Sequence, residues 1–219
     1  MVGAVDIDDL TPVAQDYVKA IWAAAEWDSQ PPSAAQLAER FGTSRAAVTD
    51  TVRRLTAQGL LTHEPYRPVE LTDLGRRLAL QMVRRHRLIE TYLVEAVGYA
   101  WDEVHDEAER LEHAVSDLFL GRIDRLLEHP QQDPHGDPIP SADGVLPPLS
   151  TSQPAVLAEA EAGSSVTVVR VSDADPAVLG RAREHGLLPG ARVTVGADAL
   201  ADEDLAAAVL VRPTDAAAD

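Results

Sequence analysis

The fold of this chain is decided by residues 33–59, SAAQLAERFGTSRAAVTDTVRRLTAQG, which predict two short helices joined by a tight turn. Gly42 supplies the turn, and Ser44 stands where the N-cap of the second helix is expected. Within that second helix Val48 and Val52 are one helical turn apart, so both side chains face the first helix. This pattern is typical of a helix-turn-helix.

The sequence on either side of this stretch completes a larger domain. Residues 11–27 carry apolar side chains at helical spacing and predict an earlier helix. Residues 60–64 and 69–72 flank a proline-containing turn and predict the strands of a β-hairpin. Helix, helix-turn-helix and hairpin in this order predict a winged helix-turn-helix domain over residues 1–74.

The outward face of the second helix in this motif is the candidate DNA-reading surface. Short hydroxyl side chains and arginine suit base edges and phosphates in the major groove. A solvated helix of any function carries the same residue types, and the hairpin that follows favours DNA. The candidate DNA-binding residues are Ser44, Arg45, Ala47, Thr49, Asp50, Thr51 and Arg53, with Arg67 at the wing tip.

The total charge at first argues against nucleic acid. The 219 residues carry a formal net charge of −17, whereas neutralising phosphates supplies much of the affinity of DNA-binding proteins. Residues 41–67, however, contain four arginines against one aspartate and one glutamate, and most of the excess acid lies further along the chain. This local basic patch is compatible with double-stranded DNA as a partner.

The composition limits the kinds of metal ligand that the chain can supply, and its hydropathy pattern indicates where the protein is located. The chain contains no cysteine, so a metal site must use carboxylate oxygens and imidazole nitrogens. Residues 1–10 lack the pattern of a signal peptide, and no later stretch approaches the roughly 20 apolar residues of a membrane span. We expect a cytoplasmic protein with no membrane partner.

The middle of the chain predicts a helical domain over residues 75–140. One long helix should run over residues 72–97 and stop at Gly98, and a second should run over residues 102–128. Residues 129–154 contain seven prolines and no sustained periodicity, which predicts a linker of restricted flexibility, with the domain boundary at residues 141–155.

The C-terminal part, residues 156–219, predicts a small β-barrel domain. Strands are expected over residues 165–171, 191–195 and 209–212, with a short helix over residues 177–185. The predicted fold class is therefore mainly α with a C-terminal β part.

Histidine and glutamate recur at helical spacing in the middle of the chain. Residues three or four apart share one helix face, and such a face can present several ligands to a divalent cation. The groupings are His86 with Glu90, His105 with Glu109, and Glu109 with Glu112 and His113. A solvated acidic face would give similar spacing for any single pair. No phosphate loop, nucleophile elbow or HExxH motif accompanies the cluster, so we expect that the protein is not an enzyme.

At these residues the chain resembles the diphtheria toxin repressor family of metal-dependent transcriptional regulators. The resemblance implies a homodimer that binds a palindromic operator through the first helices and the wing, with the next helices holding metals and dimerising. It rests on RRHRLIETYL (84–93), WDEVHDEAERLEHAVSD (101–117), the wing PYRPVELTDLGR (65–76) and GDPIP (136–140).

The resemblance also implies two metal sites. In the family, a barrel domain donates ligands to the ancillary site, and Asp175 and Val178 are the nearest counterparts here, of which only the aspartate can bind a metal. The primary site then comprises Asp16, Glu109, Glu112 and His113, and the ancillary site His86, Glu90, His105 and Asp175.

The ligand types point to the metal. Iron-responsive members of the family present Met and Cys where this chain has Asp16 and Glu109, and hard oxygen ligands suit Mn(II) better. Fe(II), Co(II) and Zn(II) remain alternatives by intrinsic affinity. Lys19 stands where compact manganese regulators of the family often have a glutamate, which sets this chain apart from their paired two-metal arrangement.

The resulting functional prediction is a manganese-responsive transcriptional repressor that controls metal uptake genes. The alternatives are an iron-responsive regulator of the same family and a metal-independent winged-helix adaptor whose acidic helices bind a protein.

Overall fold

A computed structural model describes residues 5–28, 30–64, 67–147 and 154–214. The contacts between residues divide the chain into two compact units. The first comprises residues up to Arg85 together with Pro140–Val145, and the second comprises His86–Ile139 together with residues from Leu146 onward.

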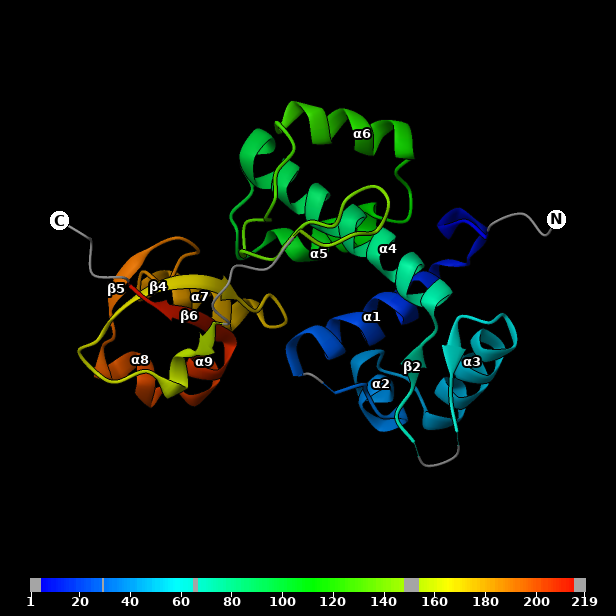
Figure 1. The fold of residues 1–219 in the computed structure, drawn as a ribbon, viewed down its shortest axis with the longest axis horizontal. Helices are drawn as coiled ribbons and strands as arrows, with labels where there is room; N and C mark the ends of the chain where they lie inside the picture. The colour runs from blue at the N-terminus through cyan, green and yellow to red at the C-terminus, as the bar shows by residue number, and fades with distance from the viewer. Residues whose placement is uncertain (1–4, 29, 65–66, 148–153, 215–219) are drawn as a thin grey trace. The chain divides into compact units, whose positions relative to one another are not determined.

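The first unit is a winged helix-turn-helix, as predicted (Figure 1). A short 3-10 helix precedes three α-helices, a two-stranded antiparallel hairpin and the first part of a long helix. These elements are η1 (Ile7–Asp9), α1 (Pro12–Asp28), α2 (Ala34–Arg40), α3 (Arg45–Ala57), β1 (Leu61–Thr62), β2 (Glu70–Leu71) and α4 (Asp73–Tyr92). The strands are shorter than predicted.

Side-chain caps explain where the helices of the helix-turn-helix begin. The Ser33 hydroxyl and the Gln36 amide oxygen each accept a hydrogen bond from the backbone N–H of the other residue, which forms a capping box at the start of α2. Ser44 accepts from the backbone N–H of Ala47 and starts α3. Gly42, with φ of +56°, makes the turn between the two helices.

The core of the first unit fixes the outward face of α3. Val48 and Val52 are almost completely buried, as the helical spacing predicts. The rings of Tyr17 on α1 and Phe41 after α2 stack with their centroids 4.4 Å apart. The apolar side of α3 is thereby anchored, and its opposite side is left to solvent.

The helical part of the second unit contains a break that the sequence analysis did not predict. α4 ends in a turn of π-helix, η2 (Leu93–Val97), and Gly98 follows with φ of +90°. The helix predicted over residues 102–128 is instead two helices, α5 (Val104–Leu111) and α6 (Asp117–Leu126). The cause is Ser116, whose backbone is extended and whose hydroxyl accepts from Phe119 N–H as the N-cap of α6.

The first half of the segment predicted as a linker is instead a buried loop. Asp133, His135 and Asp137 are all less than 7% exposed, and Ile139 joins the core between α4, α5 and α6. The carboxylate of Asp133 accepts hydrogen bonds from the backbone N–H groups of His135 and Asp137, which makes the loop rigid. Part of the predicted linker, residues 148–153, lies outside the described residues.

The C-terminal part is the predicted small β-domain. The four antiparallel strands are ordered β3-β6-β4-β5, and Figure 1 shows α8 and α9 at one end of them. The elements are β3 (Ala155–Val156), η3 (Leu157–Glu159), β4 (Ser165–Val171), α7 (Pro176–Glu184), β5 (Arg192–Thr194), α8 (Ala197–Ala201), α9 (Glu203–Ala208) and β6 (Val209–Pro213).

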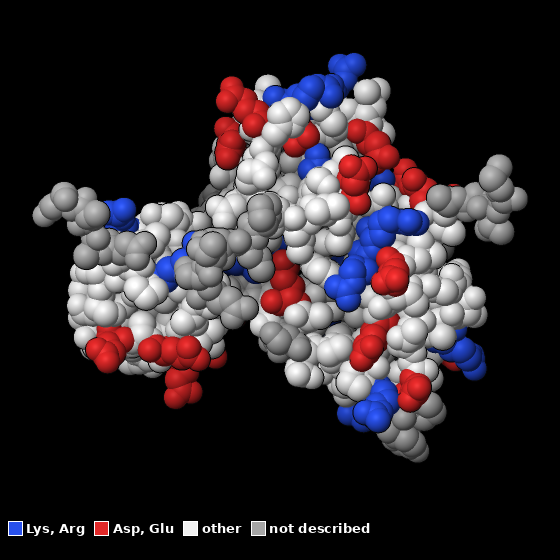
Figure 2. Space-filling view, viewed as in Figure 1, with Lys and Arg blue, Asp and Glu red and all other residues white. Residues whose placement is uncertain are grey.

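The excess acid of the C-terminal part gathers at that end of the domain. Figure 2 shows acidic side chains where α8 and α9 lie, and Asp198, Glu203 and Asp204 are exposed there. This surface would repel DNA phosphates. Among the described residues, no helix is both long and apolar enough to cross a membrane.

Candidate metal centre

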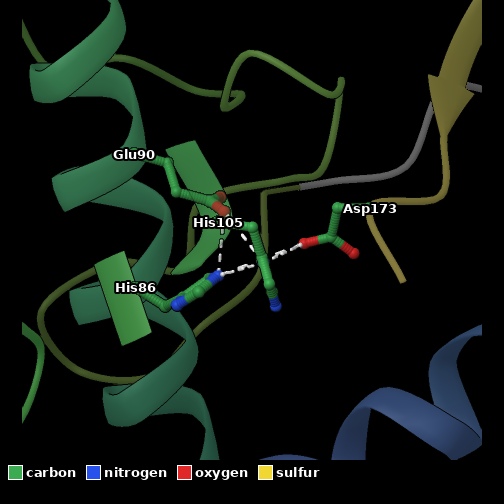
Figure 3. Close-up of side chains that lie close together, drawn as sticks. All are labelled: His86, Glu90, His105 and Asp173. Carbon is green, nitrogen blue, oxygen red and sulfur yellow. Dashed lines mark hydrogen bonds and ion pairs between the residues drawn. The ribbon is translucent and has the colours of Figure 1, made fainter. Parts of the chain in front are cut away.

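Four potential ligand residues converge in the second unit, as Figure 3 shows. His86 and Glu90 lie one turn apart on α4, and the distance from His86 Nε2 to Glu90 Oε1 is 2.9 Å. His105 Nδ1 lies 3.2 Å from the same Glu90 oxygen and 3.1 Å from Asp173 Oδ2. Each residue offers one ligand atom, and the four atoms all lie within 4.8 Å of one another. We refer to these four residues as the ancillary cluster.

The C-terminal domain contributes Asp173 to the ancillary cluster, and the predicted Asp175 lies outside it. Asp173 comes directly after β4, where Ser172 N–H donates to the carbonyl of Ala208. Asp175 is exposed and caps α7, with its carboxylate accepting from Ala177 N–H. An aspartate before a proline at a helix start is typical of an N-cap, and this signal distinguishes the two aspartates in the sequence.

A second group shares Glu90 with the ancillary cluster. Glu90, Asp133 and His135 are buried and each presents a ligand atom to the others. His135 Nδ1 lies 3.7 Å from Glu90 Oε2, beyond hydrogen-bonding distance. His135 Nε2 is 2.7 Å from the carbonyl oxygen of Trp101, which can only accept, so this nitrogen carries a proton. We refer to Glu90, Asp133 and His135 as the inner group.

Buried atoms of the inner group face one another without hydrogen bonds. Glu90 Oε2, Asp133 Oδ2 and His135 Nδ1 make none to any described residue. The nearest cation to the Asp133 oxygen is the Arg87 guanidinium, 3.7 Å away. Buried polar atoms are almost always hydrogen-bonded, so this arrangement is typical of a site that binds a ligand. The inner group was not predicted, because Asp133 and His135 fall in the proline-rich segment that the sequence pattern assigns to a linker.

Glu109, Glu112 and His113 lie close to the ancillary cluster. Glu112 is buried just after the end of α5, and its Oε2 lies 2.6 Å from His86 Nδ1. His113 Nε2 lies 3.7 Å from the other Glu112 oxygen, and His105 Nε2 lies 3.7 Å from Glu109 Oε1. The remaining residue of the predicted primary site, Asp16, is half-buried on α1 in the first unit.

Protonated histidines offset the negative charge of the carboxylates in these clusters. Burial alone lowers the pKa of His105, but hydrogen bonds to Asp173 and Glu90 outweigh burial and raise this pKa to about 10. Burial likewise lowers the pKa of His135, and the Glu90 carboxylate raises it to about 10. Burial raises the pKa of Asp173, whereas the hydrogen bond from His105 brings it down to about 2. At neutral pH the imidazolium groups of His105 and His135 therefore lie beside the ionised carboxylates of Glu90 and Asp173, whereas burial and the neighbouring Asp137 raise the pKa of Asp133.

The donor set fits a divalent cation. Every ligand atom is a carboxylate oxygen or an imidazole nitrogen, which are hard or borderline donors. In an ion with ligands at about 2.1 Å, neighbouring donors are separated by about 3.0 to 3.5 Å. In the ancillary cluster the separations of 3.1 and 3.2 Å fall within this range, and the 2.9 Å between His86 and Glu90 lies just below it.

The structure places most of the predicted DNA-binding residues on the exposed side of α3. Ser44 is its N-cap, and Asp50 and Arg53 form an exposed ion pair at 2.7 Å. Thr51 differs from the other candidates, because it is half-buried and hydrogen-bonded to Tyr17, and its contact with DNA stays a prediction. The exposed candidates are Ser44, Arg45, Ala47, Thr49, Asp50 and Arg53, with Arg67 exposed between β1 and β2. Residues 65–66 of the predicted wing lie outside the described residues.

Comparison with known families and curated proteins covers nearly the whole chain. Residues 9–69 match the iron dependent repressor N-terminal DNA binding domain, residues 72–141 match the iron dependent repressor metal binding and dimerisation domain, and residues 156–213 match the FeoA domain. The iron-dependent repressor IdeR of Mycobacterium tuberculosis is 35% identical over 198 residues, which cover 86% of each chain. The diphtheria toxin repressor of Corynebacterium jeikeium is 35% identical over 169 residues, 77% of this chain and 70% of that protein.

Solved structures agree with this assignment. A manganese-dependent transcriptional repressor in complex with manganese is 44% identical, with a TM-score of 0.80 and coverage of 92% of this chain and 100% of that chain. The manganese regulator SloR is 28% identical, with a TM-score of 0.72 and coverage of 94% and 100%. On this sequence and structural similarity, the chain belongs to the diphtheria toxin repressor family of metal-dependent transcriptional repressors.

Proposed function

We propose that this protein is a manganese-activated repressor, which binds a palindromic operator as a metal-loaded homodimer and controls metal uptake genes. The observation that carries the proposal is the convergence of oxygen and nitrogen ligands in the ancillary cluster, where His86 and Glu90 are buried and His105 and Asp173 are half-buried.

Manganese is proposed on the chemistry of the ligands. None of the candidate ligands contains sulfur, and carboxylate-rich sites suit Mn(II). The similar structure that contains manganese supports this choice, whereas the IdeR relatives are named as iron-dependent and the similar repressor ScaR has been solved with Zn(II). Fe(II), Co(II) and Zn(II) are therefore the competing ions to test.

The residues proposed to hold metal fall into two sets. In the second unit, the ancillary cluster holds one ion, and Glu90 directs its other carboxylate oxygen toward Asp133 and His135. The primary site is proposed to join Asp16 of the first unit to three residues of the second, Glu109, Glu112 and His113.

The proposed switch follows from charge. When bound, a divalent cation supplies positive charge that carboxylates of separate elements can share. Without such charge, the carboxylates of Asp16, Glu109 and Glu112 repel one another when they approach. Joining these residues fixes α1, and with it the unit that carries α3, in an arrangement that favours operator binding.

The homodimer is proposed to form through α6. Leu118 and Leu126 are 67% and 64% exposed, and Phe119 is 41% exposed, so α6 presents apolar side chains to solvent. The match to a dimerisation domain over residues 72–141 makes a second copy of this chain the expected partner. A two-fold symmetric dimer reads two symmetric half-sites, which predicts a palindromic operator.

The switch is tested by operator binding with and without Mn(II). The operator is a duplex selected from randomised DNA in the presence of Mn(II), and affinity is read from fluorescence anisotropy. Wild type should bind more tightly with Mn(II), and Glu109→Ala should lose most of this response. Glu107→Ala is a matched control, because Glu107 lies on the same helix but pairs with Arg110 instead of the clusters. Equal affinity in all conditions would contradict the proposal.

A further inference from the structure

A loop of the second unit contacts both α4 and β4, and hydrogen bonds within the loop make it rigid. Gln132 and Pro138 pair across the loop, and Ile139 N–H donates to the carbonyl of Gln131. The Asp133 carboxylate accepts from two backbone N–H groups at its tip, at 2.9 Å each. We call residues 131–139 the connecting loop. It carries Asp133 and His135, so its position sets the geometry of the inner group.

The connecting loop is attached closely to β4. The carbonyl of His135 accepts from Val171 N–H at 2.9 Å, which continues the strand pairing onto the loop. Gly136 has φ of +86°, and a Cβ added there would overlap the carbonyl oxygen of Val169. Asp137, which is 3% exposed, forms an ion pair with Arg170 of β4. Asp173 follows this strand directly, so the same attachment governs how Asp173 reaches His105.

The buried Arg87 side chain attaches the loop to α4. Arg87 donates to the carbonyl of Pro138 at 2.7 Å. Its guanidinium also lies 3.7 Å from the carboxylates of Asp133 and Asp137. Arg87 lies on α4 between His86 and Glu90 in sequence, beside the ancillary cluster.

We propose that Asp137 is a positioning residue for the metal centre: its carboxylate holds Arg87 of α4 and Arg170 of β4 together, and thereby fixes the connecting loop and Asp173 relative to His86, Glu90 and His105. Asp137 does not belong to any of the clusters, so its effect on the metal is indirect. This inference rests on the proposed function.

Asp137 acts through geometry and through charge. Removing the carboxylate leaves two buried guanidinium groups beside the site, where positive charge opposes binding of a cation. It also frees β4 to move away from α4, which would withdraw Asp173 from His105. Outer residues that orient ligands typically change metal affinity by about 10- to 100-fold when they are replaced.

The test compares Asp137→Asn with a matched control, Asp102→Asn. Asp102 pairs with Arg183 of α7 at 2.8 Å, so it also connects the C-terminal domain to the helical domain, but without contacting the connecting loop. Calorimetry with Mn(II) should show affinity reduced about tenfold or more in Asp137→Asn and less than about threefold in Asp102→Asn. Equal losses would overturn the assignment, because any contact between the domains would then suffice. Unchanged affinity in Asp137→Asn would overturn it too.

Hydrogen exchange separates this inference from the proposed function. Without added metal, the amide of Val171 should exchange faster in Asp137→Asn than in wild type, because the strand-like pairing with His135 is weakened. In wild type, Mn(II) should slow this exchange further. If wild type binds no metal, the proposed function fails, while the metal-free comparison still tests the positioning role. If Asp137→Asn does not fold, Arg170→Gln removes the same ion pair, and wild-type exchange and affinity in that variant would overturn the inference.

Discussion

Binding of Mn(II) to the ancillary cluster and inner group is expected to release protons, and their number follows from the structure. His105 and His135 each have a pKa of about 10, so both carry a full complement of protons at neutral pH. An imidazole nitrogen must lose its proton before it can bind a metal. We therefore expect release of at least one proton per subunit when His105 becomes a ligand, and of at least one more if His135 does so as well.

The same protons set the pH dependence of affinity. Both pKa values are raised, so the proton competes with the metal at every pH below about 10. Each displaced proton should make Mn(II) affinity rise about tenfold per pH unit, which is about 1.4 kcal/mol per unit. Affinity should therefore increase with pH across the neutral range.

Calorimetry in buffers with different ionisation enthalpies measures the proton count directly. The slope of the binding enthalpy against the buffer's ionisation enthalpy gives the number of protons released per metal site. His105→Gln should lower that number by about one, and His129→Gln should leave it unchanged, because the exposed His129 side chain pairs with Asp124, which belongs to neither cluster. A slope of zero in wild type, with metal bound, would refute the role of these imidazoles.

Three further predictions separate the effects of substitutions on metal ligands, on folding and on DNA contacts. Asp173→Ala should weaken Mn(II) binding by about tenfold or more. Asp175→Ala should keep the Mn(II) affinity but lower the free energy of unfolding by about 1 kcal/mol, because an N-cap is lost. The reverse pattern in calorimetry and thermal unfolding would show that Asp175 is the ligand. Gly136→Ala should lower the free energy of unfolding by about 2 kcal/mol or more, because of its positive φ and its overlap with β4, and wild-type stability in a denaturant titration would refute this. Arg53→Ala should weaken operator binding and lower the slope of log affinity against log salt concentration by about one, whereas Thr51→Val should leave this slope unchanged. Equal changes of slope in the two variants would contradict the assigned face of α3.

Much of the DNA-binding unit could be predicted from the sequence because its signals are local. Ser44 and Gly42 mark a helix start and a turn through their own local chemistry, and the structure confirms both. Helical spacing does not show which polar side chain of α3 meets a neighbouring helix, and the structure shows that Thr51 does so. The hydrogen bond to Tyr17 depends on how α1 packs.

The candidate metal centre was predictable only where its residues lie on one helix or match a family motif. His86 and Glu90 are one turn apart on α4, so their proximity follows from helix geometry. Asp173 approaches them from a distant strand, and nothing in local spacing distinguishes it from Asp175 except the capping signal. Asp133 and His135 were assigned to a linker because prolines interrupt the periodicity, although their burial depends on packing against β4.

The most direct test of the account is reciprocity between metal and operator. If metal raises operator affinity by a given factor, operator must raise the homodimer's Mn(II) affinity by the same factor, typically about 5- to 150-fold. The measurement is Mn(II) affinity with and without a saturating operator duplex, with a scrambled duplex as control. The account predicts tighter Mn(II) binding only with the operator, by the factor found in the anisotropy experiment. Identical Mn(II) affinity with operator and with scrambled DNA would contradict the claim that metal binding controls DNA binding.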